Sequence, residues 1–418
     1  MLKQRRLLAR ISRGLLIGTA LTAASGAAAQ GIDPQHFNQI EKGHYLAIVG
    51  DCAACHTLPG SGRDLAGGRG IETPFGTLVA PNITPDPVTG IGAWTDDEFV
   101  DALTKGTGRD GQHLFPAMPY TYYTKLTRDD ALAIRAYLNT VPAVQNAVKA
   151  DQLPFPFNIR ATMTVWNAMF FTPGQFKPNA GKSDDWNRGA YLAEGPAHCG
   201  LCHTPKNFLG GDKTSDALQG YALQGWFAPD ITDGHRHGLG SWSIDDVVAY
   251  LKGGHNATGF ATGPMSETLN LSTSHMSDAD LKAIATYLKD QPGRNEAAPT
   301  PDQAVTKAGS KIYADECSGC HGSGGKGEAG LVPALSGSSA VQQSDPTSLL
   351  RVVLRGARNV GTQSAPTASA MPAFGWVLND GDVAAVLTYI RSAWGNAAPA
   401  VSADEAGKAR RTFVERDD

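Results

Sequence analysis

Cysteine is scarce in this sequence, and none is left over for structural disulfides. All six cysteines lie in three copies of one pentapeptide, which are Cys52-Ala-Ala-Cys55-His56, Cys199-Gly-Leu-Cys202-His203 and Cys317-Ser-Gly-Cys320-His321. A disulfide framework or an isolated thiol nucleophile is therefore excluded unless the pentapeptides themselves supply it. Methionine is scarce as well, at seven residues.

The chain also lacks the signatures of several other functions. The Gly-rich stretch 322–330 does not end in the Gly-Lys-Ser/Thr of a phosphate-binding loop, and no GxGxxG fingerprint follows a strand pattern. Lys and Arg number 36 against 40 Asp and Glu, so no basic face is offered to nucleic acid. Without a nucleotide or flavin site, the chain is not expected to take a hydride from an organic substrate.

The long apolar run that is present lies at the amino terminus. Five basic residues between Lys3 and Arg13 precede the apolar stretch 14–24, and Ala27-Ala28-Ala29 follows. This order predicts a secretory signal peptide, residues 1–29, and so export to the periplasm. An uncleaved membrane anchor is the alternative, but the run is short for a span. Cleavage would leave 31 basic and 40 acidic residues, a net charge of −9.

The three pentapeptides have the pattern of c-type haem attachment sites. In that chemistry two thiols add to the haem vinyl groups and the adjacent imidazole binds the iron. Positions i, i+3 and i+4 share one helix face, so all three groups can reach one side of the macrocycle. A redox-active dithiol or a zinc site is the alternative, but neither explains a His after each second Cys. We expect three covalent haem c groups, bound through Cys52, Cys55, Cys199, Cys202, Cys317 and Cys320, with the iron ligands His56, His203 and His321.

The methionine spacing predicts the second axial ligand of each iron. One methionine follows the histidine of the first pentapeptide by 62 residues, and another follows that of the second by the same interval. A Met-Pro pair lies 50 residues past the third histidine. The expected axial pairs are His56/Met118, His203/Met265 and His321/Met371.

Met276 competes with Met265 for the second iron. Alignment of the repeats places Met276 opposite Leu126, at the start of a closing helix, which assigns it to packing. His/Met ligation fills both axial positions and raises the potential, which suits electron transfer rather than binding of small molecules.

The sequence around the pentapeptides repeats as well, and the repeat predicts the fold. The blocks that start at Ala80 and Ala228 recur in the same order, with a looser third copy. Short helices precede the pentapeptides, and amphipathic helices capped by Thr127, Ser277 and Asn379 close the units. We expect an all-α fold of three tandem cytochrome c-like domains, at 30–149, 186–292 and 306–395.

The remaining segments are predicted to connect or extend the domains. Prolines interrupt the first half of linker 150–185, and a short apolar helix, 163–171, follows them. Packing between domains is one interpretation of that helix, and a surface for a quinone or the bilayer is the other. Linker 293–305 is rich in Pro and Ala, and the charged tail 396–418 is predicted to be flexible.

Five stretches carry a resemblance to a known family. They are 45–57, 80–84, 188–191, 263–267 and 371–374. Over essentially the whole mature chain, the sequence resembles the triheme cytochrome c subunit of bacterial membrane-bound dehydrogenases, which oxidise alcohols, aldehydes, gluconate, sorbitol or fructose. The resemblance implies a large catalytic partner with flavin, pyrroloquinoline quinone or molybdopterin, with or without a small third subunit. It also implies electron transfer to ubiquinone from a protein peripherally attached to the periplasmic side of the inner membrane.

Two other functions stay open from the sequence. A multihaem peroxidase or oxidase component would leave one haem iron with an open site, and carbon monoxide would bind there. A free periplasmic carrier would have no dedicated dehydrogenase partner. As an electron-transfer subunit the chain would have no substrate-oxidising site of its own, and no catalytic residue is assigned.

Overall fold

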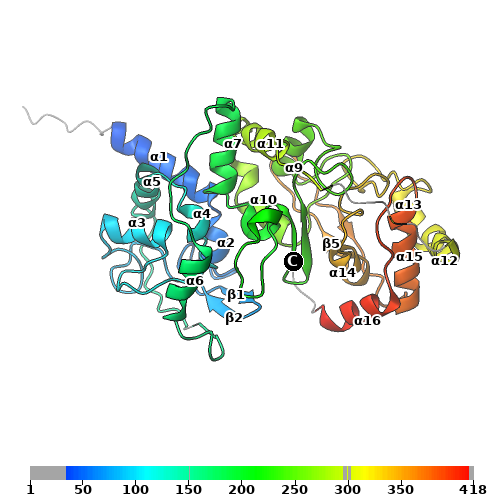
Figure 1. The fold of residues 1–418 in the computed structure, drawn as a ribbon, viewed down its shortest axis with the longest axis horizontal. Helices are drawn as coiled ribbons and strands as arrows, with labels where there is room; N and C mark the ends of the chain where they lie inside the picture. The colour runs from blue at the N-terminus through cyan, green and yellow to red at the C-terminus, as the bar shows by residue number, and fades with distance from the viewer. Residues whose placement is uncertain (1–33, 150, 295–298, 300–302, 414–418) are drawn as a thin grey trace, which may run out of the picture.

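The computed structural model describes residues 34–149, 151–294, 299 and 303–413. The predicted signal peptide, much of linker 293–305 and the last five residues lie outside this range. The described chain is mostly helical, with three small antiparallel two-stranded sheets (Figure 1). The all-α prediction omitted these sheets. In the second one, Gln224 and Gly225 both have positive φ, which gives the tight turn that joins two strands.

The elements follow one another in three groups, which we call the first (34–149), second (184–294) and third (303–413) groups. The first contains α1 (Pro34–Val49), α2 (Cys52–His56), β1 (Gly70–Thr73), β2 (Gly76–Val79), α3 (Asp96–Lys105), α4 (Tyr120–Tyr123) and α5 (Arg128–Leu138). Helix α6 (Thr162–Phe170) comes next, close to the predicted 163–171.

The second and third groups repeat this order with variations. The second contains α7 (Asp184–Glu194), α8 (Gly200–His203), η1 (Thr214–Asp216), β3 (Gln219–Leu223), β4 (Trp226–Asp230), α9 (Ile244–Gly253), α10 (Pro264–Leu271), η2 (Thr273–His275) and α11 (Asp278–Leu288). The third contains α12 (Gln303–Ile312), the π-helical η3 (Tyr313–Cys317), α13 (Ser318–His321), α14 (Thr347–Arg355), β5 (Ala357–Arg358), β6 (Ala370–Met371), α15 (Asp380–Ser392) and α16 (Ala403–Thr412).

A glycine marks the place where the opening helix of each group crosses a later helix. The pairs are α1 with α5, α7 with α11 and α12 with α15. A Cβ added to Gly43, Gly189 or Gly309 would lie 1.8, 1.9 or 2.0 Å from a backbone oxygen of the partner helix. No side chain fits at such a separation, so glycine is required for the helices to approach this closely.

The partner helices α5, α11 and α15 begin at the predicted caps. The side chains of Thr127, Ser277 and Asn379 each accept a hydrogen bond from the backbone N–H three residues on. This satisfies an N–H group that the first helical turn leaves without a partner, and it confirms the three predicted starts.

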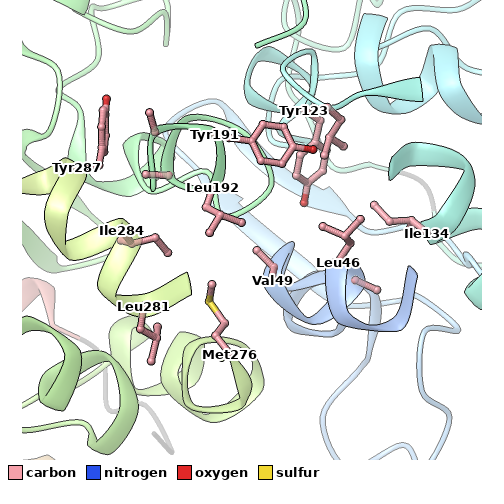
Figure 2. Packing of buried hydrophobic residues seen from close by; sticks show 14 of the residues in the cluster. Leu46, Val49, Tyr123, Ile134, Tyr191, Leu192, Met276, Leu281, Ile284 and Tyr287 are labelled. Carbon is pink, nitrogen blue, oxygen red and sulfur yellow. The ribbon is translucent and has the colours of Figure 1, made fainter. Parts of the chain in front are cut away.

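Buried apolar side chains form two separate clusters. One cluster extends across the first and second groups, and the other lies in the third group. Met276, only 1% exposed, lies in the shared cluster among Val49, Leu192 and Leu281 (Figure 2). The first two groups therefore share one core, and Met276 fills part of it.

A reciprocal set of polar contacts surrounds the shared core. Tyr45 Oη donates to Asp280 Oδ2 over 2.6 Å, and Tyr191 Oη donates to Asp130 Oδ2. Each tyrosine lies two residues after a crossing glycine, so the two contacts are equivalent under the repeat. Each carboxylate also pairs with a basic residue of its own group, Asp130 with Lys42 and Asp280 with Arg188.

The contact between the second and third groups is more polar. Ser348 Oγ accepts from the Phe227 N–H over 2.9 Å and donates to the Phe227 carbonyl over 3.1 Å. Ser338 Oγ donates to the Thr258 carbonyl over 3.0 Å. Side-chain hydrogen bonds to the backbone therefore join the third group to the second, and each side keeps its own apolar cluster.

The prediction of a flexible tail at 396–418 is wrong for the part that the structure describes. Helix α16 starts at a capping box of Ser402 and Glu405, and Arg410 pairs with Asp380 over 2.7 Å. The buried Arg391 donates to the Pro399 carbonyl over 2.8 Å. Small residues on α16 allow close packing on α15, so this polar segment docks without a strong apolar pattern.

Candidate haem attachment sites

Each pentapeptide ends in a histidine held by a proline carbonyl. The distances are 2.7 Å for His56 Nδ1 to Pro81 O, 2.7 Å for His203 Nδ1 to Pro229 O, and 3.1 Å for His321 Nδ1 to Pro333 O. A carbonyl can only accept, so each Nδ1 carries the proton and each Nε2 lone pair is left for a metal. Burial lowers the pKa of all three imidazoles, which favours the neutral form that iron ligation requires.

Short helices bring the pentapeptide side chains together. The first pentapeptide is helix α2, and the other two form α8 and α13 with Cys199 and Cys317 as their N-caps. The residue after the histidine then turns the chain in two of the groups. Thr57 Oγ1 accepts from the Leu65 N–H over 2.9 Å, and Thr204 Oγ1 accepts from the Leu218 N–H over 3.1 Å.

Burial makes at least four of the six cysteines poor reactive thiols. Burial raises the pKa of Cys52 and Cys199 to about 12, and that of Cys55 and Cys317 to about 11. A redox-active dithiol needs a lowered pKa instead. Among the described residues, no group of three or more His, Cys, Asp or Glu is arranged to hold a metal ion. The raised pKa values of these four cysteines argue against the dithiol alternative.

Buried polar atoms without a partner lie near two of the predicted methionine ligands. Ser266 follows Met265, and Trp226, whose ring packs against Gly263, has no acceptor for its Nε1–H. In the third group Asn359 Nδ2 and Ser369 Oγ are likewise unsatisfied, close to Met371 along the β5–β6 pair. A buried donor without an acceptor is costly. Haem propionates would supply acceptors, so the residues present fit the group.

The methionines occupy comparable places after a glycine-terminated helix. Met118 comes just before α4, Met265 is the second residue of α10, and Met371 ends β6. All three side chains are partly buried, whereas Met276 is fully buried in the shared core. The packing role of Met276 agrees with this, and the three axial Met assignments stay predictions.

The first two pentapeptides lie close together across the shared core. Arg69 donates to the Ala54 carbonyl in α2 and forms a bidentate pair with Glu267 of α10. Tyr122 packs against Gly200 of the second pentapeptide, and α10 itself lies against α2. Two haems held at these sites would be neighbours, which favours electron transfer between them.

Sequence reasoning missed the charged residues at this contact. The sequence did not indicate a role for Arg69, because it lies between two glycines and has no basic counterpart in the second repeat. Asp51 immediately precedes the first pentapeptide. Burial, together with the nearby negative charge of Glu267, raises the pKa of the Asp51 carboxyl to about 7. Neither the pairing of Arg69 with Glu267 nor the burial of Asp51 follows from local spacing.

The fold and the sites define the class of protein. Mostly helical groups, each with a Cys-x-x-Cys-His helix whose histidine is held through Nδ1, are the architecture of a c-type cytochrome. The Cytochrome c family model matches residues 40–142 and 306–394. Covalently bound haem c follows from these domains.

Similar proteins narrow the class further. The chain is 39% identical to the gluconate 2-dehydrogenase cytochrome c subunit of Pantoea cypripedii, over 89% of each chain. It is 38% identical to the fructose dehydrogenase cytochrome subunit of Gluconobacter japonicus, over 93% of this chain and 87% of that one. It is also 38% identical to the cytochrome c subunit of the alcohol dehydrogenase (quinone) of Gluconobacter oxydans, over 97% of this chain and 90% of that one. The chain therefore belongs to the family of dehydrogenase cytochrome c subunits.

Proposed function

We propose that this chain is the triheme electron-transfer subunit of a membrane-bound periplasmic dehydrogenase. The names of its relatives support a catalytic dehydrogenase partner, and one relative is named as a quinone-dependent enzyme. The observation that carries the count of three haems is the repeated bond from histidine Nδ1 to a proline carbonyl. That bond is present in the second group, which the family model does not match.

The chain would hold three one-electron centres and leave substrate oxidation to its partner. Haem c, when bound, supplies reversible one-electron transfer between ferrous and ferric iron. The cysteines would fix each macrocycle, the histidines and methionines would fill its axial positions, and the apolar clusters would exclude water. Oxidation of an alcohol or sugar releases two electrons, and ubiquinone accepts two electrons and two protons, so each turnover would use the relay twice.

Occupied axial positions separate this function from the peroxidase or oxidase alternative. We propose His56/Met118, His203/Met265 and His321/Met371 as the axial pairs, with the partly buried methionines as sixth ligands. The reduced protein should then bind no carbon monoxide at neutral pH. Binding at one haem would show an open site and favour the alternative.

The proposal also includes the cellular place of the chain. A cleaved signal peptide, residues 1–29, would export it to the periplasm, where covalent haem attachment occurs. Attachment to the inner membrane would be peripheral, as the family resemblance implies. In the part of the chain that the structure describes, no helix is both long and apolar enough to cross a bilayer. A large flavo-, quino- or molybdoprotein subunit and ubiquinone would be its electron donor and acceptor.

Purification of the complex from cells competent for haem attachment tests this function. We expect three covalent haems per chain, reduction of all three when the partner's substrate is added without oxygen, and reoxidation by a ubiquinone analogue. A Cys317→Ala/Cys320→Ala variant should lose one haem of the three. Two haems in the unmodified chain, or reduced haems that ubiquinone does not oxidise, would contradict the proposal.

A further inference from the structure

One surface of the molecule is apolar without an evident structural reason. It consists of six exposed side chains, which we call the α6 face: Phe155, Phe157, Ile159, Val165, Met169 and Phe208. Phe155 is 79% exposed and Phe208 is 87% exposed. Large exposed aromatic side chains that gather in one place indicate a binding surface rather than ordinary surface composition.

The six side chains come from three segments that pack on one another. The Phe157 ring lies 5.0 Å from that of Phe75, which also contacts Gly210. Trp166 of α6 donates from Nε1 to the Leu209 carbonyl over 2.9 Å. The loop that carries Phe208 therefore lies against α6 and the β1–β2 turn, so the segments that carry the α6 face are neighbours in the fold.

This surface is held in place, unlike a loose linker. The backbone of Gln152 pairs with that of Thr77, and Arg160 forms an ion pair with Asp151 over 3.0 Å. Tyr120 Oη donates to Asn167 Oδ1 over 2.6 Å, which ties α6 to the segment after Met118. Packing between the groups, one interpretation of this helix from the sequence, is thus observed, yet it uses only the inward side of α6.

The outward side of α6 carries no charge. Its exposed positions are Thr162, Thr164, Val165, Ala168 and Met169, whereas the exposed side of a helix in water is normally rich in charged residues. Between Asp151 and Asp184 the chain has no carboxylate at all and three basic residues, although acidic residues predominate in the whole sequence. Five of the six side chains of the α6 face lie in this segment, which has no carboxylate to repel an anionic surface.

We propose that the α6 face inserts shallowly into the surface of a bilayer containing anionic lipid. Phe, Val and Met side chains would enter the boundary between headgroups and acyl chains, as in interfacial helices. Helix α6 has 9 residues, so it can lie on a membrane but not span one. The proposal deepens the proposed function, on whose membrane location it rests, by naming the surface that makes the contact.

Vesicle flotation of the purified holoprotein tests the proposal. The probe is a set of vesicles of phosphatidylethanolamine with phosphatidylglycerol, in low salt. A Phe155→Ser/Val165→Ser/Met169→Ser variant should bind at least about tenfold more weakly, because three apolar side chains no longer leave water. An Ala168→Glu variant, which adds a carboxylate on the outward side, should also bind more weakly.

The control is another exposed apolar side chain away from the α6 face. Phe37 of α1 is 56% exposed, and α1 lies toward the upper edge of the view in Figure 1 while α6 lies toward the lower edge. Phe37→Ser should leave vesicle binding unchanged. All variants should keep the haem spectra and thermal unfolding of the unmodified protein, because the substituted side chains are exposed.

Three outcomes would overturn the proposal. The unmodified protein could fail to float with vesicles, or the triple variant could float as well as the unmodified protein. The triple variant could also keep vesicle binding and lose the catalytic subunit on gel filtration, which would make the α6 face a protein interface. Ubiquinone reduction by the detergent-solubilised complex tests the proposed function separately, so failure of one is distinguishable from failure of the other.

Discussion

At the scale of single residues, a proline 12 to 26 residues beyond each predicted ligand histidine determines its tautomer. Its carbonyl accepts from Nδ1 in all three groups, although the third lacks the Ala-Pro-Asn/Asp-Ile-Thr block of the other two. The hydrogen bond comes from the backbone, so it depends on the path of the chain more than on the neighbouring side chains. This explains why a looser third repeat still presents the same imidazole nitrogen.

The methionine assignments give a prediction at the same scale. Met265→Leu should remove the sixth ligand from one of the three proposed haems and lower the reduction potential of that haem by on the order of 100 mV, since a thioether ligand favours ferrous iron. Met276→Leu should leave that haem unchanged, because Met276 lies in the apolar core. Magnetic circular dichroism and potentiometric titration measure both. If only Met276→Leu changed the spectrum or potential of that haem, Met276 rather than Met265 would be the iron ligand.

Asp280 gives a prediction about pH. Burial acts to raise the pKa of Asp280, but bonds from Arg188 and Tyr45 outweigh it, and the pKa lies below its ordinary value. A lowered folded-state pKa stabilises the fold above the unfolded pKa of about 3.9, and this stabilisation is lost as pH falls through the folded value. Asp280→Asn should therefore cost about 3 kcal/mol at pH 7, and this cost should decrease below pH ~4 and disappear once the pH is below the folded-state pKa.

Denaturant unfolding across the pH range measures this difference. The matched control is Asp278→Asn, whose side chain is 82% exposed although it pairs with Lys252 over 3.1 Å. It should cost less than about 1 kcal/mol at any pH. If the two substitutions lowered the free energy of unfolding equally, the contact between Asp280 and Tyr45 would not stabilise the shared core.

At the scale of elements, a glycine at each helix crossing sets how closely the opening helix of a group approaches its partner helix. The glycines on α1, α7 and α12 occupy equivalent positions, each against a backbone oxygen of a later helix. The sequence repeat predicted the closing helices and their N-caps. The need for glycine at the crossing depends on a residue of the partner helix that is 76 to 94 positions further along the chain, and no local pattern reports that contact.

Gly309→Ala tests the crossing in the third group. The added Cβ would lie 2.0 Å from the Ala385 oxygen, so α12 and α15 would have to separate, at a cost of about 3 kcal/mol. Gly174→Ala is the control, because a Cβ there meets nothing within 4 Å, and its effect should stay within about 0.5 kcal/mol. Chemical denaturation of the holoprotein compares them. Equal stabilities would show that the helices can separate without penalty.

At the scale of the whole molecule, the chain is divided unequally. The first two groups share an apolar core, and the third has its own core behind a polar contact. Polar contacts between domains are weaker than continuous apolar cores, so the third group is the part most able to unfold separately. The closeness of the first two pentapeptides belongs to the same arrangement, since the shared core brings α2 and α10 together.

Differential scanning calorimetry of the holoprotein should therefore show two transitions. The larger should come from the first and second groups together, because they bury one common cluster. Gly309→Ala should lower the midpoint of the other transition by several degrees and leave the larger one in place. A single transition that moves as a whole would mean that the polar contact couples all three groups.

The sequence by itself determined the chemistry that depends on short spacing. The three attachment motifs, their histidines and the helix caps are readable along the chain, because covalent attachment and capping involve neighbouring residues. The 62-residue interval to two methionines is readable only because the unit is repeated. Tertiary structure alone decided the rest. Three features join segments that are not neighbours in sequence: the docking of α16, the pairing of Arg69 with Glu267, and the shared core. The tertiary structure also decided which side of α6 is exposed. The stability of the three features comes from packing between these segments, and the local period of a helix does not say which distant segment it packs against.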